Sequence, residues 1–143
     1  MYTYKFPMFS VCSDIAVICN DEVLTIVRGT EPFIGHLALV GGHLNQGEDT
    51  RTCAIRELKE ETGISIDYDN PNFVFVNLFS DPNRDPSGNK LSALYAYYCD
   101  LKPNVVASDD AIDYKWIKLS EVCNGAVKAF DHEEMIFQAF ERQ

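Results

Sequence analysis

A stretch of 23 residues, from Gly42 to Ile64, constrains the fold and chemistry of this chain more than any other segment. It follows the pattern G-x5-E-x7-R-E-U-x-E-E-x-G-U, where U is an aliphatic residue, and every specified position is met. At average residue frequencies, a chance match in a chain this long has a probability below about one in a million. The residues that satisfy the pattern are therefore expected to act together: Gly42, Glu48, Arg56, Glu57, Leu58, Glu60, Glu61, Gly63 and Ile64.

The spacing inside this stretch predicts a helix of about three turns. Asp49 or Thr50 is suited to cap its N-terminus, and Gly63 can end it in a left-handed turn. Steps of i,i+3 and i,i+4 place three carboxylates on one narrow face. These are Glu57, Glu60 and Glu61. The opposite side gathers residues that can dock on a core, namely Ala54, Ile55 and Leu58.

The acidic face is unfavourable for the helix by itself. Each i,i+4 pair of like charges costs roughly 0.2–0.5 kcal/mol, and the helix dipole disfavours anions near its C-terminus. A divalent cation reverses both penalties. Mg²⁺ is the expected ion, with Mn²⁺ as a substitute, because it prefers oxygen ligands and completes its shell with water and phosphate oxygens. More than one ion can be held when a diphosphate is present.

A solvated acidic surface is the simpler interpretation of such a face, but it leaves the fixed offsets of Gly42, Glu48, Arg56 and Gly63 unexplained. Arg56 is expected to pair with Glu48 and to hold that carboxylate toward the helix face.

The whole pattern resembles the Nudix box, the signature of hydrolases that cleave a diphosphate linkage next to a nucleoside. The resemblance covers essentially the whole chain and implies an α+β fold, an α/β/α sandwich with a central mixed β-sheet. It also implies metal ligation by Glu57, Glu60 and Glu61, with a backbone carbonyl contributed at Gly41. Glu48 and Arg56 complete the implied catalytic set.

The loop of residues 80–88, Ser-Asp-Pro-Asn-Arg-Asp-Pro-Ser-Gly, is the second informative segment. Its dipeptides are ordinary turn formers. It is also similar to the S-x-P-x-R-D-P-R-G stretch that follows the box in Nudix ADP-ribose pyrophosphatases. The resemblance implies substrate-binding roles for Arg84, Asp85 and Ser87, with Arg84 presented to a phosphate or a ribose. Ser87 stands where the family has a second arginine, which leaves the contact to the terminal ribose open.

Three further candidates have an equally good structural interpretation. Asp109 and Asp110 resemble the acidic loop that supplies a general base or a metal contact in many Nudix enzymes, but a solvated turn explains them as well. Phe33 is placed to lie against an adenine or to pack in the interior. The histidines have no partners at ligand spacing and receive no role: His36, His43 and His132.

The remaining pattern predicts strands at residues 11–19, 23–27, 37–40, 73–79, 91–99 and 114–119. The pair Gly41-Gly42 predicts a tight turn toward the helix. A final helix is expected to begin at Asp131, with Glu134 completing a capping box. Its buried side is expected to hold Met135, Ile136, Ala139 and Phe140. Strands, helix, strands and helix in this order predict an α+β sandwich.

Composition limits the size, the partners and the compartment that are expected for this chain. The 143 residues predict one domain, 1–143, and 46% hydrophobic residues suffice for a core. A net charge of −10 argues against nucleic-acid binding, whereas bound cations would still permit an anionic small substrate. Five scattered cysteines indicate reduced thiols in a cytoplasmic protein. No signal peptide and no membrane-spanning segment is expected, and a homodimer is compatible with the sequence.

These observations predict a Mg²⁺-dependent hydrolase of a nucleoside diphosphate derivative. The resemblance of Arg84-Asp85-Pro86 implies ADP-ribose as substrate and AMP and ribose 5-phosphate as products. A nucleoside triphosphate or oxidised-nucleotide hydrolase is the alternative within enzymes. A catalytically silent nucleotide sensor is the alternative from another class. Related regulators carry the same loop fused to a DNA-binding domain, for which this chain is expected to have no room, and its box carboxylates are intact.

Overall fold

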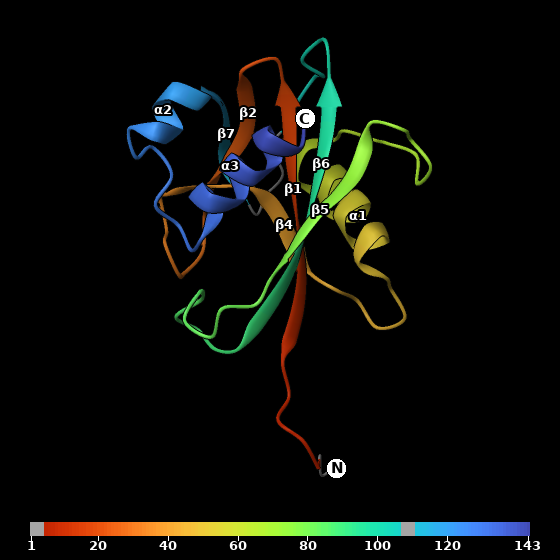
Figure 1. The fold of residues 1–143 in the computed structure, drawn as a ribbon, viewed down its shortest axis with the longest axis vertical. Helices are drawn as coiled ribbons and strands as arrows, with labels where there is room; N and C mark the ends of the chain where they lie inside the picture. The colour runs from red at the N-terminus through yellow and green to blue at the C-terminus, as the bar shows by residue number, and fades with distance from the viewer. Residues whose placement is uncertain (1–4, 107–110) are drawn as a thin grey trace.

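The computed structural model describes residues 5–106 and 111–143, arranged as a mixed sheet of seven strands with helices on both faces (Figure 1). The strands are β1 (Ser10–Cys19), β2 (Glu22–Arg28), β3 (Leu37–Ala38), β4 (Val40–His43), β5 (Phe73–Phe79), β6 (Lys90–Cys99) and β7 (Ala111–Lys118). The helices are α1 (Thr50–Thr62), α2 (Leu119–Cys123) and α3 (His132–Arg142). Within the described residues, no helix is both long enough and apolar enough to cross a membrane.

Strand β1 is the centre of the sheet. It pairs in parallel with β6 along its whole length, from Ser10 opposite Lys90 to Cys19 opposite Cys99. Its other edge is shared by two antiparallel partners, β2 near its C-terminal end and β4 along residues 12–15. The sheet continues from β2 to β3 and β7, and from β6 to β5. The predicted mixed sheet is therefore confirmed.

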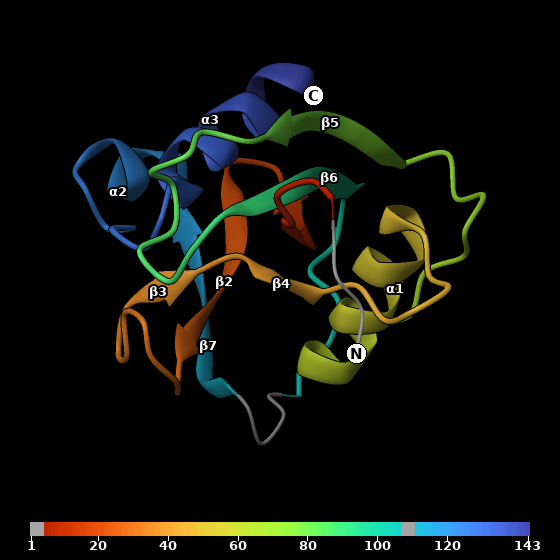
Figure 2. The same cartoon turned by 90° about the horizontal axis from the view of Figure 1, so that it is seen from below.

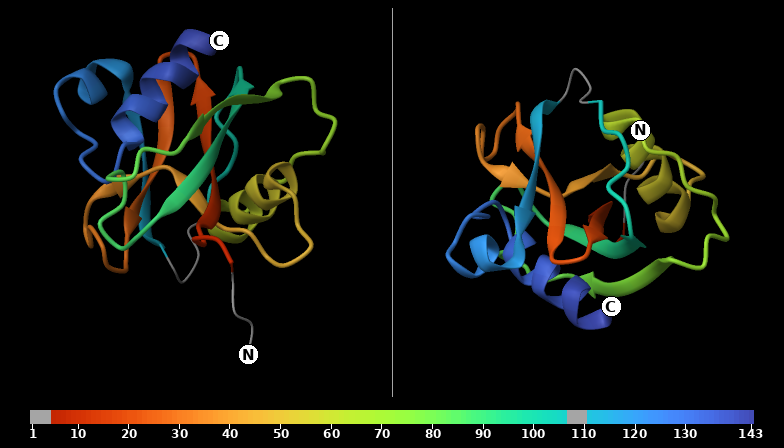
Figure 3. Two further views of the ribbon diagram at one scale, coloured as in Figure 1. Left: turned by 60° about the horizontal axis from the view of Figure 1, so that its bottom comes forward. Right: turned by 90° about the horizontal axis from the view of Figure 1, so that it is seen from above.

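Alternate residues of β1 face two separate cores. Ile15 and Val17 pack in one core with Ala54 and Leu58 of α1. Ala16 and Ile18 pack in the other, with residues of α2 and α3. The views along the sheet show α1 on one side of β1 and β6 and α3 on the opposite side (Figures 2 and 3). The α/β/α sandwich that the sequence predicts is confirmed.

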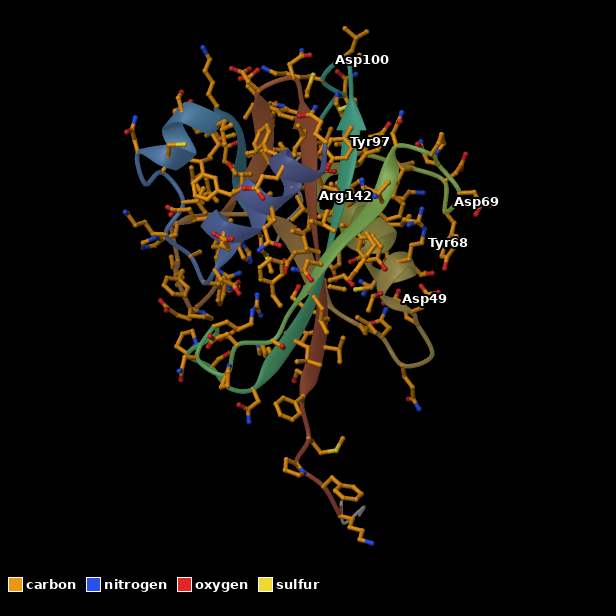
Figure 4. The ribbon with its side chains drawn as sticks, viewed as in Figure 1. Asp49, Tyr68, Asp69, Tyr97, Asp100 and Arg142 are labelled. Atoms are coloured by element: carbon orange, nitrogen blue, oxygen red, sulfur yellow. The ribbon has the colours of Figure 1, made fainter. Side chains whose placement is uncertain are left out.

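Helix α1 begins and ends as its sequence predicts. The Asp49 side chain accepts a hydrogen bond from the Thr52 N–H at 2.7 Å. Gly63 ends the helix with a φ of 76° and donates its N–H to the Lys59 carbonyl at 2.9 Å. Tyr68, from the loop after the helix, donates its hydroxyl to Asp49, and both lie on the same outer side of the molecule (Figure 4). Local capping thus fixes the length of the helix that carries the carboxylates.

The strand predicted at residues 37–40 and the turn predicted at Gly41-Gly42 are wrong in detail. The segment is split into β3 and β4, and both glycines belong to β4, opposite Asp14 and Ser13 of β1. A Cβ on Gly41 would collide with the Asp14 carboxylate, and one on Gly42 would lie 2.5 Å from Glu57 Oε1. Glycine is needed here because the backbone approaches two carboxylates closely, and no turn is required.

The C-terminal third contains two further differences from prediction. The last strand ends at Lys118, and the next five residues form the short helix α2, which the sequence analysis missed. The capping box predicted at Asp131 is also wrong, since its side chain makes no cap hydrogen bond and Glu134 accepts one from Gln138 instead. The Asp131 carboxylate is engaged by Arg84, 47 residues away in the chain, and a local pattern cannot reveal that partner.

Candidate active site

A cavity of about 700 Å³ lies where β4, the beginning of β1, the β2–β3 loop and the loop of residues 80–88 meet. Its size suits a ligand as large as a nucleotide. Charged side chains of both signs line its wall. The carboxylates are Asp14, Glu31, Glu57, Glu61 and Asp85, and the lysine and arginine side chains are Arg28, Arg84 and Lys90.

Glu61 is the most perturbed acid of this wall. Burial, the nearby charge of Glu57 and a hydrogen bond to it, and the charge of Asp14 together raise the pKa of Glu61 to about 9, against the opposing effect of the Gly41 N–H. Burial also raises the pKa of Glu57, although Arg56 opposes that shift. Among the described residues, Glu61 Oε2 is a buried side-chain oxygen that has no hydrogen-bond partner. Two adjacent carboxyls with raised pKa values, one of them with an unused buried oxygen, are oxygen donors that could hold a cation.

The chemistry of these donors fits a hard divalent cation. All the side-chain donors are carboxylate oxygens, which Mg²⁺ and Mn²⁺ bind. Over residues 5–106 and 111–143, no three His, Cys, Asp or Glu side chains converge closely enough to enclose an ion by themselves. A cation held by Glu57 and Glu61 would therefore take other ligands from backbone oxygens, water or substrate phosphate, as Mg²⁺ commonly does. Ligation by the Gly41 carbonyl stays a prediction.

Arg56 organises the acidic cluster, and its predicted pairing with Glu48 is present. Its Nε donates to Glu48 Oε2 at 2.7 Å and its Nη2 to Glu48 Oε1 at 2.9 Å. Its Nη1 reaches Glu57 at 2.8 Å and Glu60 at 3.1 Å, and Nη2 also donates to the His43 carbonyl at 2.9 Å. The hydrogen bond from Arg56 is the largest cause that lowers the pKa of Glu48 to about 2. One guanidinium thus fixes three carboxylates and the end of β4.

Glu60 differs in position from the other two glutamates of the predicted metal set. Its side chain is 58% exposed and is absent from the cavity wall, where Glu57 and Glu61 lie. Its described contact is the ion pair with Arg56. Metal ligation by Glu60 stays a prediction, and in this structure its carboxylate helps to orient Arg56.

The loop of residues 80–88 forms part of the cavity wall, and all three residues predicted there line it: Arg84, Asp85 and Ser87. The guanidinium of Arg84 is buried and bound by Asp131, from Nε to Oδ2 at 2.9 Å and from Nη2 to Oδ1 at 2.7 Å. Asp85 Oδ1 accepts from the Ser87 N–H at 2.8 Å and from its hydroxyl at 2.6 Å. The hydrogen bonds between Arg84 and Asp131 therefore tie the loop to the start of α3.

Two other predicted regions have different outcomes. Phe33 is not among the residues of the cavity wall; it packs edge-on against Phe130, with ring centroids 4.9 Å apart. Phe130 lines the cavity instead, and the guanidinium carbon of Arg28 lies 4.9 Å from its ring centroid. Asp109 and Asp110 lie outside the described residues.

A buried polar group on the cavity wall was not predicted from the sequence. Asp14 accepts a hydrogen bond from the Ser92 hydroxyl at 2.5 Å and lies 3.7 Å from His132 Nε2. His132 Nδ1 accepts from the Leu39 N–H at 3.0 Å, and burial lowers the pKa of this histidine. The one signal of this group in the sequence is the position of Asp14, directly before the apolar run of β1. A charge at such a position is expected to be buried and therefore to need polar partners. Its partners Ser92 and His132 are 78 and 118 residues away in the chain.

The structure is a mixed sheet between helices, with a carboxylate-bearing helix facing a nucleotide-sized cavity. Comparisons with known proteins identify the family to which it belongs. The chain belongs to the Nudix family, since the model of the NUDIX domain matches residues 11–139. It is 32% identical over 133 residues to the ADP-ribose pyrophosphatase of Methanocaldococcus jannaschii, covering 93% of this chain and 73% of that protein. It is 30% identical to the ADPR responsive transcriptional repressor NtrR of Acinetobacter baylyi, covering 97% of this chain but only 55% of the repressor.

Solved structures agree with this family assignment. The ADP-ribose-bound NUDIX domain of Shewanella oneidensis NrtR matches with a TM-score of 0.85 at 25% identity, covering 99% of this chain and 93% of that one. The bifunctional NMN adenylyltransferase/ADP ribose pyrophosphatase of Francisella tularensis was solved with AMP and a manganese ion. It matches with a TM-score of 0.85 at 31% identity, covering 97% of this chain and 43% of that one.

Proposed function

We propose that this protein is a Mg²⁺-dependent pyrophosphohydrolase that cleaves ADP-ribose to AMP and ribose 5-phosphate. The observation that carries the proposal is the buried pair of Glu57 and Glu61, with the unused oxygen of Glu61, on the wall of a nucleotide-sized cavity. Support for ADP-ribose comes from the loop of residues 80–88 on the same wall. The pyrophosphatase of Methanocaldococcus and the ADP-ribose-bound domain of Shewanella support the same substrate.

The residues of the chain have separable tasks in this reaction, in which water attacks one phosphorus and the bridging P–O bond breaks. A divalent cation held by Glu57 and Glu61 would neutralise charge on the phosphate oxygens and lower the pKa of bound water. Arg56 fixes Glu57 and Glu48 in place through hydrogen bonds from its guanidinium. These contacts orient the carboxylates before the substrate binds, so little reorganisation is needed during the reaction.

A substrate panel tests the proposal. kcat/KM is measured with Mg²⁺ for ADP-ribose, NADH, ATP and an oxidised dGTP, and the products are identified by mass. We expect ADP-ribose to be preferred and to give AMP and ribose 5-phosphate. A tenfold or greater preference for a triphosphate, worth about 1.4 kcal/mol at the transition state, would overturn the substrate assignment and favour the triphosphate or oxidised-nucleotide hydrolase.

A nucleotide sensor is the second candidate, favoured by two relatives. The Acinetobacter relative is named as an ADPR-responsive repressor, and the NUDIX domain of the Shewanella protein NrtR was solved with ADP-ribose. A sensor would bind ADP-ribose without turning it over. Calorimetric binding measured beside turnover separates the two: binding in Mg²⁺ with no detectable AMP release would favour the sensor.

A further inference from the structure

The three lysine and arginine side chains on the cavity wall differ in how far their hydrogen-bond donors are already used. Arg84 gives two donors to Asp131. Arg28 donates its Nε to the Pro32 carbonyl at 2.7 Å, and its guanidinium lies over the ring of Phe130. Among the described residues, the ammonium group of Lys90 has one ion-pair partner, Asp85, at a longer distance.

Lys90 lies on the cavity wall, and its ion pair with Asp85 leaves N–H donors of its ammonium group unused. Its Nζ lies 3.6 Å from Asp85 Oδ2, beyond hydrogen-bond distance, and its side chain is only 20% exposed. The other oxygen of Asp85 is occupied by the N–H and the hydroxyl of Ser87. The ammonium group is therefore a largely buried cation with N–H donors that remain available to a ligand.

Lys90 begins β6, which pairs with β1. Strand β1 in turn packs against α1, the helix that carries Glu57 and Glu61. Lys90 is the first residue of β6, which begins one residue after the loop of residues 80–88. Two residues later, Ser92 pairs with Cys12 of β1, and Cys12 pairs on its other side with His43 of β4. His43 and Lys90 both line the cavity. Lys90 thus lies on the same cavity wall as Gly41 and Gly42.

We propose that Lys90 is a substrate-binding residue that donates hydrogen bonds to a phosphate group and supplies, from β6, the cation that is missing at Ser87. Ser87 itself cannot take this role because its hydroxyl is committed to Asp85. A phosphate is the matching ligand class because several charged oxygens can reach one ammonium group while Asp85 keeps it in place. The substrate that carries this phosphate is the one named in the proposed function, on which this inference rests.

Kinetics of Lys90 variants test the proposal. Lys90→Met removes the charge and nearly keeps the length of the side chain, Lys90→Gln removes the charge but stays polar, and Lys90→Arg keeps the charge. Lys115→Met on β7 is the matched control, because this exposed lysine is absent from the cavity wall. We expect Lys90→Met and Lys90→Gln to raise KM for ADP-ribose by roughly 10- to 100-fold, as typical for a charge-assisted hydrogen bond. The change in kcat should stay within about threefold, and Lys90→Arg should retain most of the affinity.

A binding measurement without turnover separates this inference from the proposed function. In Mg²⁺ buffer, inorganic phosphate and ribose 5-phosphate should raise the melting temperature of the wild-type protein and of Lys115→Met. Both ligands should have a much smaller effect on Lys90→Met and Lys90→Gln. An equal shift in all four proteins, or an Arg variant as impaired in KM as the Met variant, would overturn the role of Lys90. Absence of ADP-ribose turnover by the wild type, with the phosphate shifts still dependent on Lys90, would overturn only the proposed function.

Discussion

Replacing Glu61 with glutamine is expected to stabilise the metal-free protein while it abolishes metal-dependent turnover. The pKa of Glu61 is raised from 4.5 to about 9, first by burial and next by the negative charge of Glu57. At neutral pH the folded protein therefore keeps the Glu61 proton, and the unfolded chain has lost it. Releasing that proton on unfolding favours the unfolded chain, a penalty that a non-titrating glutamine removes.

The size and the sign of this effect follow from the two pKa values. The stability contributed by protonated Glu61 is fully present below about pH 4.5 and is lost progressively as the pH rises toward about 9. The pKa of Glu61 in the unfolded chain is 4.5, so pH 7 lies about 2.5 pH units above it. Each unit corresponds to about 1.4 kcal/mol of free energy of unfolding. The upper limit is therefore on the order of 3 kcal/mol, or roughly 10 °C in melting temperature for a chain of this size.

Urea unfolding in EDTA at pH 5 and at pH 7.5 is the assay. The free energy of unfolding of Glu61→Gln should exceed that of the wild type clearly at pH 7.5 and only slightly at pH 5. Glu60→Gln, an exposed carboxylate on the same helix, is the control and should change little at either pH. With Mg²⁺ and substrate, Glu61→Gln should lose roughly 10² or more in turnover. A variant less stable than the wild type at pH 7.5, or a difference independent of pH, would refute the reasoning.

Three other outcomes are expected. Arg56→Ala should lower both turnover and melting temperature, because it leaves Glu48 without its partner beside other carboxylates; a rise in melting temperature would contradict the pairing account. Arg84→Ala should lower the free energy of unfolding by roughly 1.5–3 kcal/mol, and a double-mutant cycle with Asp131→Ala should recover most of that loss as coupling. Mg²⁺ with a non-hydrolysable ADP-ribose analogue should raise the melting temperature much more than the same analogue in EDTA; equal shifts would argue against a metal-bridged diphosphate.

The sequence predicts helix α1 and its acidic face because the information needed is local. The cap at Asp49, the left-handed glycine at its end and the i,i+4 spacing of the carboxylates all lie within one stretch of chain. The pairing of Arg56 with Glu48 is also correct, since its signal is the same fixed spacing. The sequence could not predict how α1 is rotated about its axis relative to the cavity. The spacing groups three glutamates on one face, whereas the cavity wall includes Glu57 and Glu61 but not Glu60.

Features that depend on distant contacts could not be predicted. The glycines of β4 look like a turn in the sequence, and only the approach of Asp14 and Glu57 explains why a strand needs them. Arg84 suggests a free substrate contact, but its partner Asp131 comes from the start of α3 and was assigned to a cap. Lys90 is an ordinary lysine at the beginning of a strand until the fold places it on the cavity wall next to Asp85. Tertiary partners override local propensity at each of these positions.

The charge of the chain makes a metal requirement easier to understand. A net charge of −10 repels a nucleoside diphosphate at long range, and the cavity wall contains five carboxylates against three lysine and arginine side chains. Two of those cations are partly neutralised, by Asp131 and by Asp85. Without a divalent cation, a diphosphate would therefore enter a field of its own sign. With a cation bound at Glu57 and Glu61 that field is reversed locally, and Lys90 and Arg28 add to the attraction. Under the proposed function, the acidic helix face, unfavourable for the isolated helix, would make substrate binding conditional on the metal.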